Sequence, residues 1–186
     1  MTAGLIIAVD AMSGDHGAAV AVPAALDVLA AVPDLRILLV GKGDVLRPLV
    51  GMPLPARCSI VEASEVVGMD ELPRDAIRRK KDSSMRVAVN LVKKGEATAC
   101  VSAGNTGALL AMARFVLGMI PGIDRPAIVS AMPAAHGHTV MLDLGANPDC
   151  TAEHRVQFAA MGSVIASDLH GVDRPRIGLL NIGEED

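Results

Sequence analysis

Aromatic side chains are almost absent from this chain. Its 186 residues include no Trp, no Tyr and only two Phe, Phe115 and Phe158. Stacking platforms for single-stranded nucleic acid are built from aromatic side chains, so the composition excludes that class of protein. A net charge of −4 also excludes a generally basic surface, and we expect no nucleic-acid partner. The core must instead be built from Ala, Val, Leu, Ile and Met.

Cysteines and long apolar runs are scarce as well. Cys58, Cys100 and Cys150 form neither a CxxC pair nor an even set, which favours a reducing cytoplasm over a disulfide framework. The segment before Asp10 lacks the basic start of a secretory signal. The best candidate for a membrane span, 108–120, is interrupted by Arg114, so we expect no bilayer-spanning segment.

Short apolar runs alternate with helical patterns along the whole chain. Continuous apolar runs are typical of strands buried on both faces, and they predict strands at 5–9, 36–40, 58–61, 99–102, 127–132, 139–142 and 176–180. Helices are predicted at 23–31, 44–50, 73–81, 83–94, 106–117 and 152–169, with Ser83 as the N-cap of the fourth.

This order indicates a single α/β domain over 1–186, with helices on both sides of one mainly parallel sheet. We expect 5–9, 36–40, 99–102, 127–132 and 176–180 to share that sheet. The link 133–138 is too short for a helical crossover, so the fifth and sixth strands are predicted to form an antiparallel hairpin.

Polar, glycine-rich loops follow four of the predicted strands, at 10–17, 102–107, 143–150 and 181–185. Open parallel sheets bind ligands beyond the carboxyl ends of their strands, so we expect the four loops to converge on one edge. For one loop alone, glycine in a tight turn is the better explanation, but four together favour a ligand site. The candidate binding residues on these loops are Asp10, Gly14, Asp15, Ser102, Gly104, Thr106, Gly107, Asp143, Gly145, Asn181 and Gly183.

The loop at 102–107 carries the most specific of these signals. Asn105 and Thr106 directly precede an apolar helical pattern. The first N–H groups of a helix have no partner within it and favour an anion, and phosphate is the simplest choice.

A basic segment covers residues 74–94. It contains eight Lys or Arg against two Asp, a local net charge of +6 in a chain of net −4. Such a segment can attract an acidic partner or a phosphate, although a solvated helix surface would have the same composition. The part directly ahead of the predicted helix gives the candidates Lys80, Lys81, Ser83 and Ser84.

Several other chemistries are disfavoured. His136 and His138 lack a third ligand at a recognisable spacing, so a hairpin turn is favoured over a metal site, and we predict no metal. Burial of Cys150 as a small apolar side chain is favoured over nucleophilic catalysis, because no general base is identifiable beside it. There is no Walker A motif, and we predict no cofactor.

Five motifs, taken in order, resemble the acyl-ACP:phosphate acyltransferases, the PlsX family. They lie at 8–15, 79–85, 102–108, 142–150 and 174–185. The resemblance implies a three-layer α/β sandwich like those of isocitrate dehydrogenase and phosphotransacetylase. It also implies a cytoplasmic, homodimeric enzyme of bacterial phospholipid synthesis that makes long-chain acyl phosphate from acyl-acyl carrier protein and inorganic phosphate.

Two departures from the family pattern affect these expectations. Ser13 stands where the family usually has glycine, which costs backbone freedom if that position needs a positive φ. Family members also continue well past Glu185, so this chain is expected to be the N-terminal part of a longer member with little activity alone. Any peripheral membrane contact would then lie in a part that is not present.

The chemistry implied by the resemblance needs positioning more than base catalysis, because phosphate is already an anion at neutral pH. We expect phosphate on the backbone N–H groups of 104–107, with Lys80 or Lys81 offsetting its charge. Asn105 or Asn147 would donate to the oxyanion of the attacked thioester. The alternatives are a non-catalytic domain that binds phosphate or carrier protein, and a phosphotransacetylase-like enzyme that uses acyl-coenzyme A.

Overall fold

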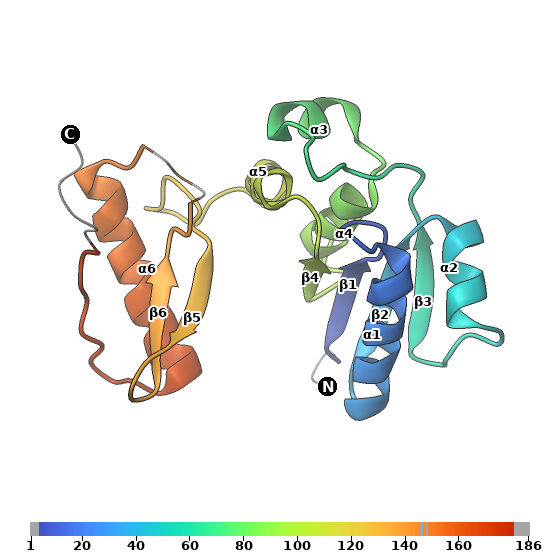
Figure 1. The fold of residues 1–186 in the computed structure, drawn as a ribbon, viewed down its shortest axis with the longest axis horizontal. Coiled ribbons are helices and arrows are strands. Elements are labelled where there is room, and N and C mark those ends of the chain that lie inside the picture. The colour runs from blue at the N-terminus through green and yellow to red at the C-terminus, as the bar shows by residue number, and fades with distance from the viewer. Residues whose placement is uncertain (1–3, 146, 148, 181–186) are drawn as a thin grey trace. The chain divides into compact units, whose positions relative to one another are not determined.

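The computed structural model describes residues 4–145, 147 and 149–180. They group into two compact units, 1–118 and 119–186, drawn in blue to yellow and in yellow to red in Figure 1. The sequence indicated a single domain over the same range. Each unit has its own sheet, which is the physical basis of the division.

The first unit is built on a four-stranded parallel sheet of order β3-β2-β1-β4. Its strands are β1 (Ile6–Asp10), β2 (Arg36–Gly41), β3 (Cys58–Glu62) and β4 (Ala99–Ser102). In the register of the sheet, Ile7 lies between Ile37 and Ala99. The predictions of parallel strands at 5–9, 36–40, 58–61 and 99–102 are therefore confirmed.

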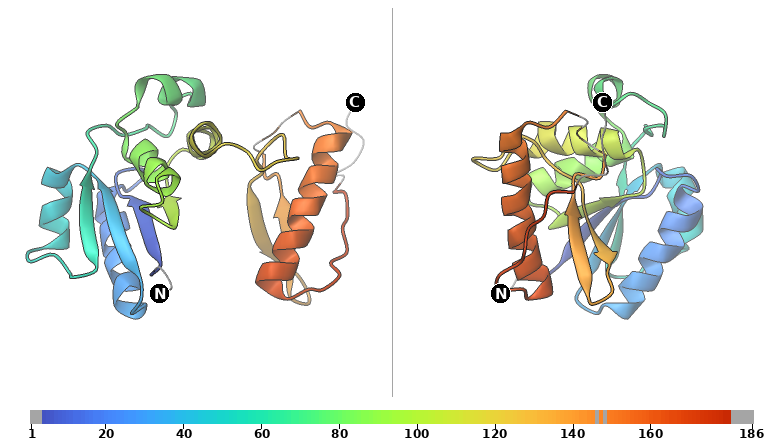
Figure 2. Two further views of the ribbon diagram at one scale, coloured as in Figure 1. Left: turned by 180° about the vertical axis from the view of Figure 1, so that it is seen from behind. Right: turned by 60° about the vertical axis from the view of Figure 1, so that its left-hand side comes forward.

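Helices cover both faces of this sheet (Figure 2): α1 (Ala18–Ala31) and α2 (Gly43–Val50) lie on one face and α4 (Ser84–Lys93) on the other. Two further helices of this unit, α3 (Pro73–Arg79) and α5 (Thr106–Leu117), pack against each other, and α5 packs against α4. Leu39 faces α1 and α2 in one apolar cluster, and its neighbour Val40 faces α4 in another. Alternate residues of β2 are thus buried on opposite faces, as the continuous apolar run predicted.

Helix α1 begins five residues before the predicted start at Pro23. Its buried residues are Ala18, Val22, Ala25 and Leu29, which follow the helical spacing i, i+4, i+7 and i+11. Proline is favoured at a helix start, which is why the sequence placed the boundary there. Burial of Ala18 and Val22 extends the helix through the exposed Pro23.

Helix α4 begins as the sequence predicted. The Ser83 hydroxyl is the N-cap and accepts a hydrogen bond from the Arg86 N–H at 3.3 Å. The same hydroxyl donates to the Lys80 carbonyl at 2.9 Å, which closes a tight turn. Helix α3 therefore ends at Arg79, two residues earlier than predicted.

The second unit contains a hairpin and one long helix. Strands β5 (Val129–Pro133) and β6 (His138–Leu142) pair antiparallel and are joined by a turn with Gly137 at φ 75°. Helix α6 (Ala152–His170) follows, with the Thr151 hydroxyl as its N-cap. The predicted hairpin and helix are both confirmed.

Two predictions about the sheet are wrong. The strand at 129–133 pairs with 138–142 in a separate two-stranded sheet and not with β1–β4. Residues 176–180 form no strand: Ile177, Leu179 and Leu180 are at least 60% exposed. An apolar run becomes a strand only when a neighbouring strand pairs with its backbone, and 176–180 has none among the described residues. Within the described part of the chain, no helix is long and apolar enough to cross a membrane.

Arg57 holds the carboxyl end of α1 in the first unit. Its guanidinium donates to the carbonyls of Leu29, Val32 and Leu35 at 2.7–2.8 Å. The Val32 carbonyl also accepts from the Leu35 N–H at 3.2 Å, so Arg57 is a second partner there. Arg57→Met should lower the free energy of unfolding by about 2 kcal/mol, because three hydrogen bonds from a charged donor are lost.

Denaturant unfolding checks this expectation, with Arg47→Met as the matched control. Arg47 pairs with Glu62 at 2.8 Å, but both side chains are about 60% exposed, so the control should cost well under 1 kcal/mol. Equal destabilisation by the two variants would contradict the role assigned to Arg57.

Candidate functional site

The candidate site lies where the strand order of the first unit reverses. The chain runs outward from β1 to β2 and β3, and then returns to place β4 on the other side of β1. The loops that leave β1 and β4 therefore turn to opposite faces of the sheet, which opens a crevice at their carboxyl ends. These are two of the four loops that the sequence selected.

The Asp10 carboxylate ties the two loops together. It is 1% exposed, accepts from the Met12 N–H at 3.3 Å, and accepts from the Ser102 hydroxyl at 2.7 Å. The Ser102 oxygen in turn accepts from the Gly104 N–H at 3.1 Å. Asp10 and Ser102, both predicted to bind substrate, are thus occupied in joining the two loops.

Glycine allows the loops to approach each other closely. A Cβ at Gly104 would lie 2.6 Å from the Ser13 Cβ and 2.9 Å from the Met85 Cε. Gly14 has φ 91° and lies against the Ala103 carbonyl. Among the described residues, Asp143 is the only non-glycine with positive φ, so Ser13 needs no left-handed backbone and its replacement of glycine costs no such strain.

The first turn of α5 presents free backbone donors. Asn105 is the N-cap, and its Oδ1 accepts from the Ala108 N–H at 3.0 Å. The N–H groups of Thr106 and Gly107 make no hydrogen bond to any other described residue. Both residues are exposed, so an anion from solvent can reach these donors.

The side-chain amide of Asn105 is already engaged. Its Nδ2 lies 2.8 Å from the Met69 carbonyl, 2.9 Å from the Glu71 carbonyl and 3.4 Å from the Gly68 carbonyl. An amide nitrogen has two hydrogens, so these carbonyls use both. In this arrangement Asn105 has no hydrogen to donate to an oxyanion.

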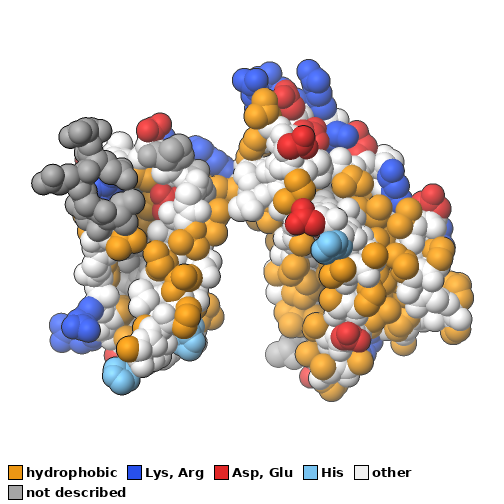
Figure 3. Space-filling model, viewed as in Figure 1, with side chains coloured by type: hydrophobic (Ala, Val, Ile, Leu, Met, Phe, Trp, Pro, Cys, Tyr) orange, Lys and Arg blue, Asp and Glu red, His pale blue; other side chains and the backbone are white. Residues whose placement is uncertain are grey.

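The basic segment presents charge beside this turn. Arg74, Arg78, Arg79 and Lys81 are exposed and Lys80 is half-buried. Figure 3 shows Lys and Arg side chains gathered over α3, at the top of the first unit. Ser83 and Ser84 are fully buried, so two serines that were predicted to bind substrate point into the protein. Asp15, by contrast, is exposed.

The second unit gathers the remaining described candidates around Asp143. Its carboxylate accepts from the Asn147 amide at 2.8 Å and from the Cys150 thiol at 3.3 Å. Asn147 also donates to the Pro126 carbonyl at 3.0 Å, and Gly145 donates its N–H to the Asp143 carbonyl at 2.9 Å. Asn181 and Gly183 lie outside the described residues. Of the four loops expected to converge, the structure describes those at 10–17 and 102–107 in the first unit and most of the one at 143–150 in the second, while 181–185 lies outside the described residues.

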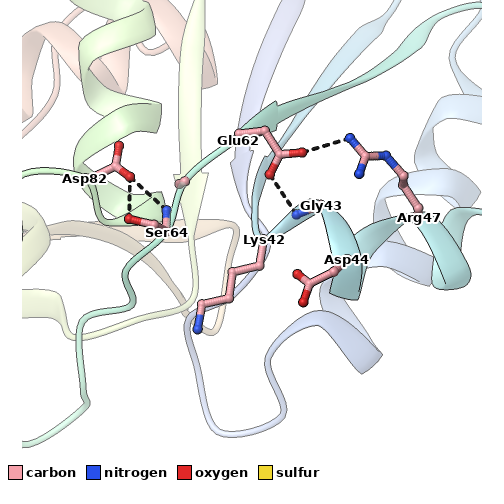
Figure 4. Close-up of a pocket in the computed structure, with 8 residues that line it drawn as sticks. Lys42, Gly43, Asp44, Arg47, Glu62, Ser64 and Asp82 are labelled. Atoms are coloured by element: carbon pink, nitrogen blue, oxygen red, sulfur yellow. Dashed lines mark hydrogen bonds and ion pairs between the residues drawn. The ribbon is translucent and has the colours of Figure 1, made fainter.

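A pocket of about 400 Å³ lies at the ends of β2 and β3 (Figure 4). Glu62 accepts from the Gly43 N–H at 2.9 Å and from Arg47 at 2.8 Å, while Asp82 accepts from the Ser64 N–H at 2.9 Å. The hydrogen bonds from Ser64 hold the pKa of Asp82 below its usual value. The sequence analysis missed this pocket. The available signal was Gly41 at the end of β2, followed by Lys42 and Gly43.

The fold is that of an α/β enzyme of the phosphotransacetylase type. A phosphotransacetylase from Streptococcus pyogenes superposes with a TM-score of 0.65 over 91% of this chain and 55% of that chain, at 19% sequence identity. The likeness at this identity concerns the fold alone.

The chain belongs to the family described as "Fatty acid synthesis protein", whose model matches residues 5–186. It is 58% identical to a phosphate acyltransferase of Alkalilimnicola ehrlichii over 100% of this chain and 55% of that relative. It is also 58% identical to a phosphate acyltransferase of Nitrosococcus oceani, over 96% of this chain and 54% of that relative. The family resemblance carried by the five motifs is confirmed. The chain spans about half the length of these relatives.

Gly104→Ala tests the contact between the two loops. The added Cβ has no room beside Ser13, so we expect a loss of 1–3 kcal/mol in the free energy of unfolding, as is usual for overpacking. Ser13→Gly removes the opposing Cβ and should recover part of that loss in the double variant. Gly178→Ala is the control, since its Cβ would meet nothing within 4 Å. Strictly additive effects at positions 13 and 104 would contradict the contact.

The pH dependence of Cys150 alkylation tests its contact with Asp143 in the second unit. Burial, and then the hydrogen bond and charge of Asp143, raise the pKa of its thiol above the usual value. The thiol is therefore protonated at neutral pH and should alkylate slowly. Asp143→Asn removes the negative charge, so alkylation of Cys150, followed by mass spectrometry at a series of pH values, should shift its midpoint to lower pH. An unchanged or higher midpoint would contradict the contact.

Proposed function

We propose that this chain carries the phosphate-binding and carrier-binding part of an enzyme that transfers a long-chain acyl group from acyl carrier protein to inorganic phosphate. The observation that carries the proposal is the exposed first turn of α5, which has two free N–H donors beside a basic segment. Membership of the family and the names of the relatives agree with it.

Phosphate binding uses backbone donors in this proposal. The N–H groups of Thr106 and Gly107 receive phosphate oxygens, and the positive end of the α5 dipole favours the anion. Lys80 or Lys81 offsets the remaining charge.

The reaction is an acyl transfer from sulfur to oxygen. A phosphate oxygen attacks the thioester carbonyl carbon, a tetrahedral oxyanion forms, and the C–S bond breaks. The thiolate leaves and takes a proton from water, which gives acyl phosphate and the free carrier thiol. A thiol pKa of about 8.5 makes this a fair leaving group, so strong acid catalysis is not required.

The oxyanion needs a hydrogen-bond donor, whose loss typically costs about 3 kcal/mol in the transition state. Of the two asparagines predicted for this role, Asn105 has both amide hydrogens engaged by the loop at 68–71. Asn147 donates to Asp143 and to Pro126. We therefore assign the anion contacts to the backbone donors of α5, because the described hydrogen bonds of the Asn147 amide stay within the second unit.

The partner is recognised by charge. Acyl carrier proteins are strongly acidic, and the exposed Arg74, Arg78, Arg79 and Lys81 offer the complementary surface. The resemblance adds a homodimeric assembly, a cytoplasmic location and a place in phospholipid synthesis, which belong to the same proposal.

Charge reversal at Lys80 and Lys81 tests the proposal in the natural full-length protein. Acyl phosphate formed from acyl carrier protein and labelled phosphate is measured across a salt series. At low salt the Lys80→Glu/Lys81→Glu variant should raise the KM for the carrier at least tenfold. The difference should shrink toward physiological salt and above, because exposed charges are screened over about 8 Å.

Reversal of Lys93 and Lys94, at the other end of α4, is the matched control and should change the carrier KM less. An unchanged rate at low salt would remove the basic segment from the proposal. Turnover of acyl-coenzyme A in place of the carrier substrate would favour the phosphotransacetylase alternative, and binding of carrier without any acyl phosphate would favour the non-catalytic one.

A further inference from the structure

Asn105 joins two parts of the chain that are more than thirty residues apart. Its Oδ1 caps α5, while its Nδ2 reaches the carbonyls of Met69 and Glu71 at 2.8 and 2.9 Å. These carbonyls belong to the loop that leads into α3. One side chain therefore fixes both the first turn of α5 and the approach to the basic segment.

A second contact brings the same parts together. A Cβ at Gly107 would lie 3.1 Å from the Pro73 Cγ, so the first residue of α3 packs against the first turn of α5. Behind this contact, Val67 and Ala76 share an apolar cluster with Met85, Ala108 and Met112. The cluster is small, which makes the polar contacts of Asn105 a large share of what holds 66–79 in place.

The loop itself has few hydrogen bonds of its own. The Gly68 N–H donates to the Glu71 carboxylate at 3.2 Å, and the Glu71 N–H donates to the Gly68 carbonyl at 3.3 Å. Both are long contacts at an exposed turn. The loop therefore depends on Asn105 for its conformation.

We propose that Asn105 is a positioning residue that holds the basic helix α3 beside the anion-binding turn of α5, so that the carrier protein docks in register with bound phosphate. Docking of the carrier protein rests on the proposed function. The contact of the Asn105 amide with the loop at 68–71, which we call the clamp, rests on the hydrogen bonds alone.

A substitution of a positioning residue changes other kinetic constants than a substitution of a catalytic residue does. A residue that contacts phosphate or the oxyanion would alter kcat or the phosphate KM. A residue that places α3 alters the carrier KM, because the basic surface is displaced while the N–H groups of Thr106 and Gly107 remain.

Two variants in the natural full-length protein separate the clamp from the cap. Asn105→Asp keeps an excellent N-cap acceptor but places a carboxylate against the carbonyls of 68–71, which repels the loop. Asn105→Ser keeps a capping oxygen and cannot reach the loop. Thr151→Ala, which removes the N-cap of α6, is the control for loss of a cap alone.

The first measurement is backbone hydrogen exchange. In both Asn105 variants, peptides covering 66–72 should exchange at least tenfold faster, while peptides from the middle of α5 should be unchanged. The control should leave 66–72 as it is. Unchanged exchange in 66–72 would overturn the clamp, whatever the enzyme does.

The second measurement is steady-state kinetics. Asn105→Ser should raise the carrier KM about tenfold and leave kcat and the phosphate KM within twofold, whereas the carboxylate of Asn105→Asp would also repel phosphate at the adjoining N–H groups. A fall in kcat or a rise in the phosphate KM of Asn105→Ser would overturn the positioning role and return Asn105 to the chemistry. If the wild-type protein makes no acyl phosphate, the proposed function fails, and hydrogen exchange still decides the clamp.

Discussion

The first unit depends on one buried carboxylate at the point where its strand order reverses. Asp10 is surrounded by the sheet and accepts hydrogen bonds from its own loop and from Ser102 on the neighbouring strand. A buried charge is tolerated only when such donors satisfy it. The requirement therefore keeps the ends of β1 and β4 together, and the first turn of α5 follows directly after that junction.

Glycines allow further close contacts in the first unit. Gly14 lies against the Ala103 backbone, Gly104 against the Ser13 side chain, and Gly107 of α5 against the Pro73 side chain of α3. The result is a site made mostly of backbone groups and polar side chains that bond to one another. Chemistry of this kind suits a nucleophile that arrives already charged, because the protein has to place it and not activate it.

The hydrogen-bond partners change how the candidate residues are understood. Polar groups expected of a binding site occur at Asp10, Ser102 and Ser83. Each of them forms hydrogen bonds with neighbouring backbone or with another loop instead. Residue type alone does not separate these roles, because a serine that caps a helix or joins two loops looks the same in the sequence as a serine that binds a ligand. The described candidates that are exposed to solvent are Asp15, Lys81, Thr106, Gly107 and Gly145.

Local patterns predicted all six described helices, all six described strands and, through the five motifs, the family. Each predicted helix overlaps an observed one, and Ser83 was correctly predicted as an N-cap, because capping and apolar periodicity are local properties. Which strands share a sheet was not predictable in this way. The predicted hairpin forms a sheet separate from β1–β4, and 176–180 has no partner strand among the described residues, since pairing depends on neighbours distant in sequence. Tertiary structure also gave both amide hydrogens of Asn105 to the loop at 68–71, a contact across more than thirty residues that no local pattern contains.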